Sequence, residues 1–240
     1  MENENPANGR QFSTTRWSLV LLAGQKLSTE SAAALEKLCH AYWSPVCNFA
    51  RRRGWREEDA KDLTQQFFAG LLERNDFHGL DPKRGKFRTF LLVAFTHFLA
   101  NEYDRINALK RGGGKVISLE EAGLDEIPPA SQLSPAAQYD AQWAGTILQI
   151  ALHRLKNEMA QSGRPEQFDE LKQFLTANGG ADEYAAVAAK LGVKPSSVPV
   201  LVHRLRQQYR ELVRDEVAQT VTSPIELGEE MHHLFAVLNQ

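Results

Sequence analysis

The sequence predicts an all-α protein with two helical domains. Apolar residues recur at helical spacing through most of the 240 residues, and no segment shows the apolar–polar alternation of a half-buried strand. The composition changes after Arg111, where three consecutive glycines, a Pro-Pro pair and several acidic residues are typical of a linker. We therefore expect a helical domain at 12–112, a flexible acidic linker at 113–134, a second helical domain at 135–220 and an amphipathic tail at 221–240.

Four helices are expected in the first domain. Capping residues precede the apolar segment 13–24 and a glycine ends it, which are the usual start and stop signals. A second helix covers 28–54, with a break or kink near Pro45, because a proline inside a helix removes a backbone hydrogen bond. The spacing of apolar side chains predicts a third helix at 56–75 and a long fourth helix at 86–111.

The second domain is expected to contain a helix-turn-helix. The helices are expected near 135–160, 165–177, 182–191 and 197–219. The third of these is rich in small residues and ends at Gly192, and a short turn follows. Ser196 or Ser197 is expected to cap the long last helix, as in a helix-turn-helix.

The composition is that of an ordinary globular protein, with 42% hydrophobic and 24% charged residues and a net charge of −2. No apolar run approaches the roughly 18 residues that span a bilayer, and the N-terminal residues lack the apolar core of a signal peptide. We therefore expect a cytoplasmic protein with no membrane partner. Because the chain has no positive excess, any role on DNA must depend on local basic patches or on a partner.

No enzymatic or metal site is expected. Cys39 and Cys47 are the only cysteines, and with His40 they lack a fourth ligand at zinc-site spacing, so we expect reduced core cysteines. The stretch RGGGK at 111–115 lacks the spacing of a phosphate-binding loop, and the chain contains neither an HExxH motif nor a nucleophile elbow. The sequence therefore predicts no catalytic residue and no cofactor.

The stretch DAKDLTQQFF at 59–68 places many polar side chains beside large apolar ones. On a helical wheel Asp59, Asp62 and Gln66 fall on one arc, while Leu63 and Phe67 fall on the opposite half. This pattern fits either a solvated face of a surface helix or a docking face for a partner.

Basic and aromatic residues interleave in the segment that follows. Lys83, Arg84, Lys86 and Arg88 cluster around a glycine, and the next helix contains phenylalanines and ends in Arg105, Lys110 and Arg111. Such a surface suits the tracking of a nucleic-acid backbone with stacking of unpaired bases. Phe87, Phe90 and Phe98 are each better explained individually as core residues.

These segments resemble region 2 of the extracytoplasmic-function sigma factors of bacterial RNA polymerase. In that family the polar helix of this helical bundle docks on the clamp helices of the largest polymerase subunit, and the loop and following helix capture and melt the −10 promoter element. The resemblance assigns polymerase binding to Asp59, Asp62, Leu63, Gln65, Gln66 and Phe67. It assigns −10 DNA binding to Lys83, Arg84, Lys86, Arg88, Asn101, Arg105, Lys110 and Arg111. Gln66 stands where many members have a glutamate, so the docking face is less acidic here.

The helix-turn-helix is similar to region 4 of the same family, which recognises the −35 element. The resemblance assigns −35 DNA binding to Lys194, Ser196, Ser197, Val200, His203, Arg206, Gln207 and Arg210. A solvated basic stripe is the alternative for the outer face of this helix. Many members have a lysine where this chain has Pro199, so hydrogen-bonded base recognition must come from Lys194, the two serines or His203.

The resemblance predicts a sigma factor that binds core RNA polymerase, recognises and melts promoter DNA and directs transcription initiation. Near-neutral charge is compatible with this function because the polymerase supplies most of the positive surface. A stand-alone helix-turn-helix regulator and an inactive sigma-like adaptor are the alternatives. An anti-sigma factor and a kinase are candidate further partners.

Two segments raise hypotheses about regulation. The tail has an apolar stripe at Ile225, Leu227, Met231, Leu234, Phe235 and Leu238. It either packs back on a domain and limits access to polymerase or DNA, or caps the core of the second domain. Thr64 falls in the apolar half of its helix, so we expect a buried hydroxyl that bonds to the preceding turn. The alternative is phosphorylation, which would add negative charge to the docking helix.

Overall fold

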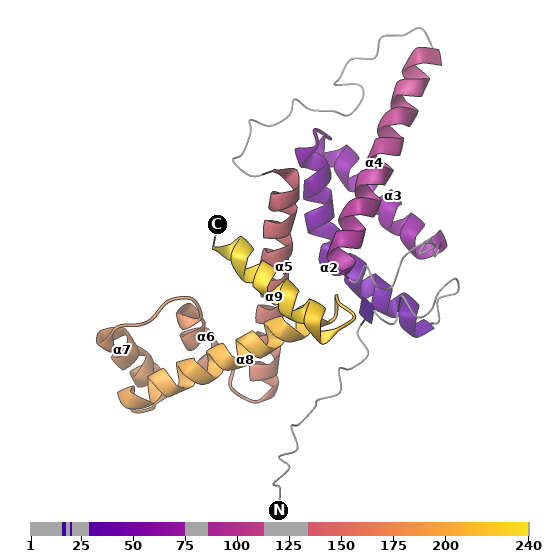
Figure 1. Cartoon of the computed structure of the whole chain (residues 1–240). Coiled ribbons are helices and arrows are strands. Elements are labelled where there is room, and N and C mark those ends of the chain that lie inside the picture. The colour runs from indigo at the N-terminus through magenta and orange to yellow at the C-terminus, as the bar shows by residue number, and fades with distance from the viewer. Residues whose placement is uncertain (1–15, 18–19, 21–28, 75–85, 113–133, 240) are drawn as a thin grey trace, which may run out of the picture. The chain divides into compact units, whose positions relative to one another are not determined.

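The computed structural model of the chain describes residues 16–17, 20, 29–74, 86–112 and 134–239 (Figure 1). Every secondary-structure element in these residues is a helix, and no strand occurs among them, which confirms the all-α class. The chain forms two compact units: the first comprises Met1–Pro128 and Ala218–His232, and the second comprises Pro129–Val217 and His233–Gln240. The linker expected at 113–134 lies outside the described residues, except for Ser134.

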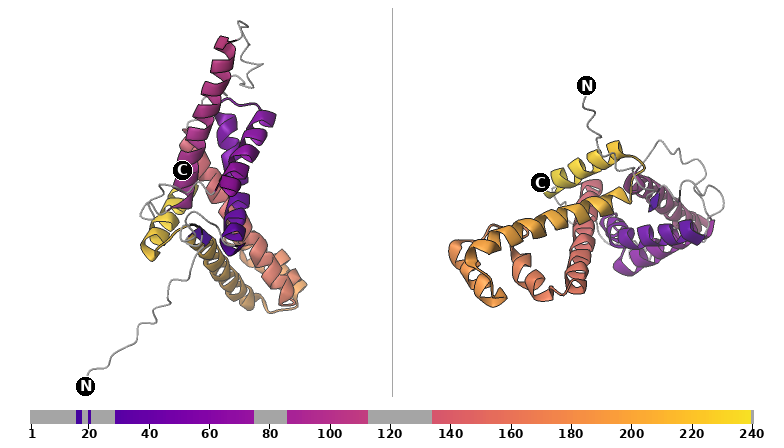
Figure 2. Two further views of the ribbon diagram at one scale, coloured as in Figure 1. Left: turned by 90° about the vertical axis from the view of Figure 1, so that its right-hand side faces the viewer. Right: turned by 90° about the horizontal axis from the view of Figure 1, so that it is seen from below.

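The first unit is built on three helices. These are α2 (Thr29–Arg52), α3 (Glu57–Arg74) and α4 (Phe87–Gly112). Gly54, with a φ of 94°, allows the sharp turn from α2 to α3. Helix α4 lies across α2 and α3 (Figures 1 and 2). Helix α2 runs without interruption through the buried Pro45, so of the break or kink expected there the break does not occur.

Aromatic rings fill the space between these helices. Phe67 of α3 contacts Phe95 at 4.9 Å between ring centroids and Phe98 at 5.6 Å. Phe87 and Phe95 are buried, which confirms the core alternative for Phe87, whereas Phe90 and Phe98 are only half-buried. The rings of α4 therefore build the core and also leave two aromatic edges near the surface.

The C-terminal segment belongs to the first unit up to His232. The N–H of Phe87 donates to the carbonyl of Thr220 at 3.0 Å, and the N–H of Trp17 donates to the carbonyl of Gln219 at 3.1 Å. Val221 is buried beside these bonds. The boundary expected at residue 220 thus does not separate a domain from a tail, because residues 218–232 complete the core around the start of α4.

Helix α9 (Pro224–Leu238) begins with its own caps. The N–H of Glu226 donates to Ser223 Oγ at 3.3 Å. In return, one carboxylate oxygen of Glu226 accepts the N–H and the hydroxyl of Thr222, both at 2.8 Å. This reciprocal arrangement resembles a capping box, and Pro224 at the first helical position adds a favourable φ. The start of α9 is therefore encoded locally.

The second unit contains the remaining helices. They are α5 (Pro135–Gln161), α6 (Pro165–Leu171), η2 (Lys172–Phe174), α7 (Ala181–Leu191), η3 (Pro195–Ser197) and α8 (Val198–Ala218). Ser134 caps α5 by accepting the N–H of Ala137 at 3.2 Å. Trp143 and Leu155 of α5 are buried, as are Val202 and Leu205 of α8. Helix α6 ends well before the expected residue 177, and a 3-10 turn continues it only to Phe174.

A tight turn connects this 3-10 segment to α7. The rings of Phe174 and Tyr184 meet edge to face at 5.1 Å, and the N–H of Gly179 donates to the Tyr184 hydroxyl at 3.3 Å. A Cβ atom on Gly179 would lie 2.5 Å from a ring carbon of Phe174 and 2.6 Å from a ring carbon of Tyr184. Only glycine fits this position without moving one of the rings.

Replacing Gly179 with alanine should therefore destabilise the second unit. We expect Gly179→Ala to cost roughly 1–3 kcal/mol, as other overpacking substitutions do. The matched control is Gly145→Ala in α5, where no atom lies within 4 Å of the added methyl group. That change should stabilise the helix by about 0.5–1 kcal/mol. Urea unfolding followed by circular dichroism compares the two, and equal midpoints would refute the steric argument.

Candidate functional site

Helix α3 presents the first candidate surface. Asp62, Gln65 and Gln66 are exposed and Asp59 is half-buried, whereas Leu63 and Phe67 are buried on the opposite side. Among the described residues, neither Asp59 nor Asp62 has a basic partner within ion-pair distance. The only acidic group of this helix that pairs with described cations is Glu57, which lies 2.7 Å from Lys61 and 3.6 Å from Arg51. The face therefore offers unpaired carboxylates and amides to a partner.

Thr64 lies on the buried side of the same helix. Its exposed fraction is 0%, and its hydroxyl donates to the carbonyl of Ala60 at 2.6 Å. This geometry confirms the expectation of a buried threonine that bonds to the preceding turn. A kinase could reach the hydroxyl only after α3 had detached from the core.

A groove runs between α3 and α4. Its volume is about 240 Å³, and it is lined by Gln66, Phe67, Gly70, Leu71, Phe90, Ala94, His97, Phe98 and Asn101. The half-buried rings of Phe90 and Phe98 provide flat apolar walls. The amides of Gln66 and Asn101 provide both donors and acceptors at its margin. The groove can therefore hold a flat polar ring.

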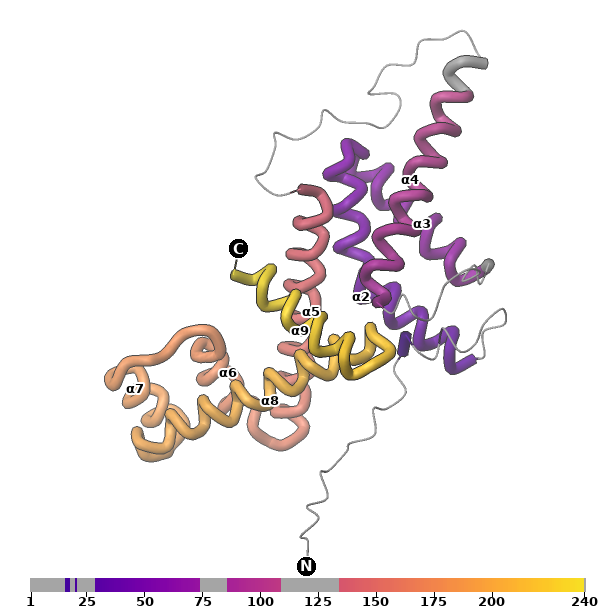
Figure 3. Tube along the Cα trace, viewed as in Figure 1, coloured from indigo at the N-terminus to yellow at the C-terminus, as the bar shows by residue number. Residues whose placement is uncertain are grey.

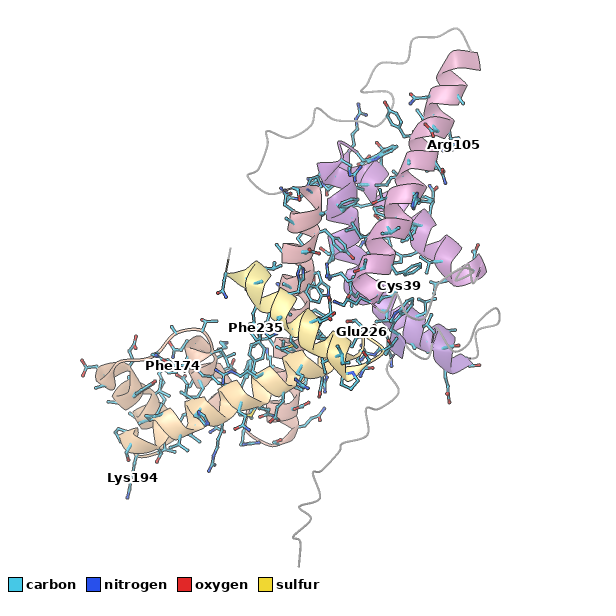
Figure 4. The ribbon with its side chains drawn as sticks, viewed as in Figure 1. Cys39, Arg105, Phe174, Lys194, Glu226 and Phe235 are labelled. Atoms are coloured by element: carbon cyan, nitrogen blue, oxygen red, sulfur yellow. The ribbon has the colours of Figure 1, made fainter. Side chains whose placement is uncertain are left out.

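The basic residues assigned to the −10 element do not form one free surface. Lys83 and Arg84 lie outside the described residues, and so do the side chains of Lys110 and Arg111. Arg105 is exposed on the half of α4 that extends past α2 and α3, and it pairs with Glu102 of its own helix at 2.8 Å (Figure 4).

Lys86 and Arg88, at the start of α4, are paired with the C-terminal helix. Both oxygens of Glu230 accept hydrogen bonds from the Arg88 guanidinium, from Nε at 3.0 Å and from Nη2 at 3.1 Å. Lys86 Nζ lies 2.9 Å from Glu229 and 3.3 Å from Glu230. The Arg88 side chain is therefore only 12% exposed in this state, and its assignment to DNA stays a prediction.

The Glu230 carboxylate is ionised in this cluster. Burial alone would raise its pKa, but the hydrogen bonds and charges of Arg88 and Lys86 outweigh burial and hold the pKa below its ordinary value. A carboxyl group with a depressed folded-state pKa contributes stability above its unfolded-state pKa. That contribution is lost as the pH falls through the folded-state pKa, so acid weakens the cluster.

The turn between α7 and α8 forms the second candidate surface. Gly192 ends α7 with a φ of 65°, and the N–H of Val193 donates to the carbonyl of Ala188 at 3.0 Å. The chain direction changes by 104° from α7 to the segment Pro195–Ala218, within the range of helix-turn-helix motifs (Figure 3). Lys194 lies at the tip of this turn (Figure 4).

The serine caps expected for α8 do not form. Residues 195–197 make the 3-10 turn η3, in which the N–H of Ser197 donates to the carbonyl of Lys194 at 2.9 Å. Neither Ser196 nor Ser197 makes a side-chain hydrogen bond with the residues that the structure describes. Ser196 is exposed and Ser197 half-buried, so their hydroxyls remain available to a ligand.

Most of the residues assigned to the −35 element share the exposed side of α8. Val200 is 50% exposed, and His203, Gln207 and Arg210 are exposed along the following turns. Gln207 also donates to Glu211, one turn further on, at 3.3 Å. These side chains therefore form one surface that a partner can reach.

Arg206 is the exception and has a structural role. Its Nε donates to the carbonyl of Phe174 at 2.8 Å, its Nη2 to the carbonyl of Ala177 at 2.7 Å and its Nη1 to Asn178 Oδ1 at 3.0 Å. All three nitrogens are used to fix the turn before α7. The assignment of Arg206 to DNA stays a prediction, although each of its nitrogens is already bonded to this turn.

Arg204 belongs to the exposed face but was missed from the sequence. It is exposed one turn after Val200 and makes no ion pair with any described residue. The signal was present, because the buried positions Val198, Val202 and Leu205 define an inward direction. Arg204 lies on the side opposite to them, whereas Arg206 lies at the flank.

The two cysteines are core residues. Cys39 and Cys47 are buried free thiols of α2, which confirms the expectation of reduced core cysteines. Burial raises the pKa of the Cys39 thiol to about 12 and also raises the pKa of Cys47. In the part of the chain that the structure describes, no three His, Cys, Asp or Glu side chains gather as a metal site.

Comparison with known proteins does not assign the chain to a family. No family model, no curated protein and no solved structure matches it. No single helix of the described residues is long and apolar enough to cross a membrane; only α7 together with Pro195–Ala218, a sharply bent pair, meets those criteria. The resemblance to sigma factors therefore remains a prediction from sequence.

Introducing a charge at Thr64 should destabilise the first unit. We expect Thr64→Glu to cost about 3 kcal/mol or more, since an unpaired charge would be buried against the apolar half of α3. Thr64→Val, which keeps the shape, is the matched control and should cost much less. Thermal unfolding measures both. A glutamate variant as stable as the wild type would indicate that α3 exposes this position.

Removing Arg206 should also destabilise the protein, but removing Arg204 should not. Arg206→Ala leaves two carbonyls and one amide oxygen without their donor, and we expect a cost of roughly 1–3 kcal/mol. Arg204→Ala is the same change two residues earlier on an exposed side chain and should stay within about 0.5 kcal/mol of wild type. Urea unfolding separates the variants, and equal midpoints would contradict the structural role.

Proposed function

We propose that the chain is a sigma factor of the extracytoplasmic-function type, a dissociable subunit that directs RNA polymerase to promoters. The observation that carries this proposal is the pairing, in one chain, of a helix-turn-helix that has a free outer face with a unit whose α3 offers unpaired carboxylates. The protein would act by binding alone and catalyse no reaction. It would work in the cytoplasm, where the polymerase is.

The polar face of α3 supports docking on a basic protein surface. Asp59 and Asp62 project from an apolar-backed helix that the aromatic core holds in place. Carboxylates that are not paired within the molecule are available for complementary charges on a partner. On the proposed function these groups meet the clamp helices of the largest polymerase subunit, with Gln65 and Gln66 as neutral hydrogen-bonding groups beside them.

The groove between α3 and α4 supports the capture of an unpaired base. Its volume of about 240 Å³ is of the size of a single flat ring system. Phe90 and Phe98 line the groove, although each already stacks on a ring of the unit, Trp17 and Phe95 respectively. Stacking of a base on an aromatic side chain is worth about 1–3 kcal/mol. The amide of Asn101 can accept from and donate to a base edge. A base held here would stabilise melted promoter DNA.

The outer face of α8 supports duplex binding with modest sequence selectivity. Lys194, Ser196 and Ser197 lie at the end of α8 that enters the major groove in such motifs, and their polar groups are free to contact bases. Val200 brings no hydrogen-bond donor and can contact only a thymine methyl group. Arg204 and Arg210, further along the helix, suit phosphate contacts that fix position.

A stand-alone DNA-binding regulator is the second candidate. It is favoured by the second unit, which has its own core and a complete helix-turn-helix. The net charge of −2 weighs against it, because binding without a partner depends on a positive surface. Run-off transcription with core polymerase on a promoter library tests the proposal. A gel shift by the free protein, without polymerase-dependent transcription, would favour the regulator instead, and polymerase binding without transcription would favour an adaptor.

Charge reversal on α3 should weaken polymerase binding. We expect Asp59→Lys together with Asp62→Lys to weaken it by a few kcal/mol, because like charges would face each other across the interface. Stability should barely change, since neither side chain lies in the core. Glu30→Lys together with Glu36→Lys, the same reversal on exposed positions of α2, is the control. Pull-down of core polymerase measures both, and undiminished capture by the α3 variant would refute the docking face.

A further inference from the structure

The carboxylates of α9 hold Lys86 and Arg88 in the geometry of a phosphate contact. Arg88 grips both oxygens of Glu230 with two parallel hydrogen bonds, at 3.0 and 3.1 Å. Arginine binds phosphate oxygens through the same planar fork. Lys86 lies between Glu229 and Glu230 and completes a cluster of two cations and two anions. The α9 carboxylates therefore occupy the positions that a nucleic-acid backbone would take.

Stability alone does not account for charges at this position. The Glu230 side chain is 1% exposed, and taking an ion pair out of water costs about as much as the attraction returns. In other proteins, replacing a buried ion pair by apolar side chains of similar size is often neutral or stabilising. The cluster also leaves Lys86 25% exposed at its edge, so the cations are covered but not deeply enclosed.

The segment that brings these carboxylates belongs to the first unit but satisfies the start of its helix by itself. Its helix start is satisfied by Ser223, Glu226 and Thr222, all within the segment itself. Helix α9 would therefore keep its first turn if it left α4. Among the described residues, its links to α4 include the ion cluster, the backbone bond from Phe87 to Thr220 and buried side chains such as Leu227.

We propose that Glu229 and Glu230 act as an internal substitute for DNA phosphates, which masks Lys86 and Arg88 until α9 moves away. The inference rests on the proposed function, because it assigns the two cations to promoter DNA. While α9 is docked, the chain binds a nucleic-acid backbone with two cations fewer. The apparent affinity of the chain for DNA equals the affinity of the undocked form multiplied by the fraction of molecules in which α9 is undocked.

Neutralising the two carboxylates tests the masking directly. The variant is Glu229→Gln with Glu230→Gln in the full chain, and the probe is a short fluorescent single-stranded DNA of mixed sequence. Binding is measured by anisotropy over a range of salt concentrations. Each additional phosphate contact steepens the plot of log K against log salt by about 0.7 for single strands. We expect a slope steeper by about 1.4, and tighter binding by about tenfold at low salt.

Two further variants make the result specific. Adding Lys86→Gln to the double variant should cancel about half of the gain in slope. Glu30→Gln with Glu36→Gln removes the same charge from exposed positions of α2 that no described cation contacts, and it should leave the slope unchanged. If the buried substitution unfolds the unit, Glu229→Gln alone keeps the test valid. That carboxylate is 59% exposed, and its loss leaves Lys86 with Glu230 alone, so we expect a slope that steepens by up to half as much as in the double variant.

The outcomes separate masking from the proposed function. A folded double variant whose DNA affinity and salt dependence equal those of the wild type would overturn the masking, and the cluster would then be purely structural. This conclusion would hold even if the wild type supports transcription. A variant that gains DNA contacts while neither protein supports polymerase-dependent transcription would uphold the masking and reject the sigma-factor assignment. A gain of equal size in the α2 control would show a general charge effect and overturn the masking.

Discussion

The first unit depends on the burial of one ring at the start of α4. Phe87 is completely buried, with Trp17 and Tyr42 each at 4.9 Å between ring centroids. Its backbone N–H bonds to Thr220, so segments from both ends of the chain meet at this residue. Burying such a ring is worth about 1.5–3 kcal/mol, and the aromatic pairs add to it. The contacts that join the N-terminal and C-terminal segments of the unit thus depend on the first residue of α4, Phe87.

The same constraint fixes the charged groups beside it. Lys86 and Arg88 flank Phe87 in sequence, so a ring directed into the core turns both neighbours toward the edge of that core. The segment that bonds to Phe87 continues directly into α9, which brings Glu229 and Glu230 to the two cations. Packing and electrostatics are therefore coupled here. A change that loosened the contact at Thr220 would also loosen the hold on the cations.

Local pattern was sufficient to predict most of the described helices and the two faces of α3, although α6 ends earlier than expected and most of the segment 13–24 lies outside the described residues. The burial of Thr64 and the end of α7 at Gly192 follow from periodicity and backbone conformation, which nearby residues determine. The partners of Arg206 and Arg88 could not be predicted, because they lie on segments about 30 and 140 residues away in sequence, at Phe174 and Glu230. Helical spacing predicts the direction in which a side chain points, but it does not predict which residue of another segment that side chain contacts. The continuity of α2 through Pro45 was missed for the same reason, since the packing of its buried flanks outweighs one lost hydrogen bond.

The polar face of α3 and the cations at the start of α4 differ in what must happen before each can bind a partner. Asp59 and Asp62 of α3 have no basic partner among the described residues and can meet a basic protein surface as they stand. The cations at the start of α4 are already neutralised and can meet DNA only after an exchange of partners. On the proposed function this difference imposes an order, with polymerase first and promoter second. An almost neutral chain with covered cations has little attraction for bulk DNA, so it would reach promoters chiefly as part of the polymerase.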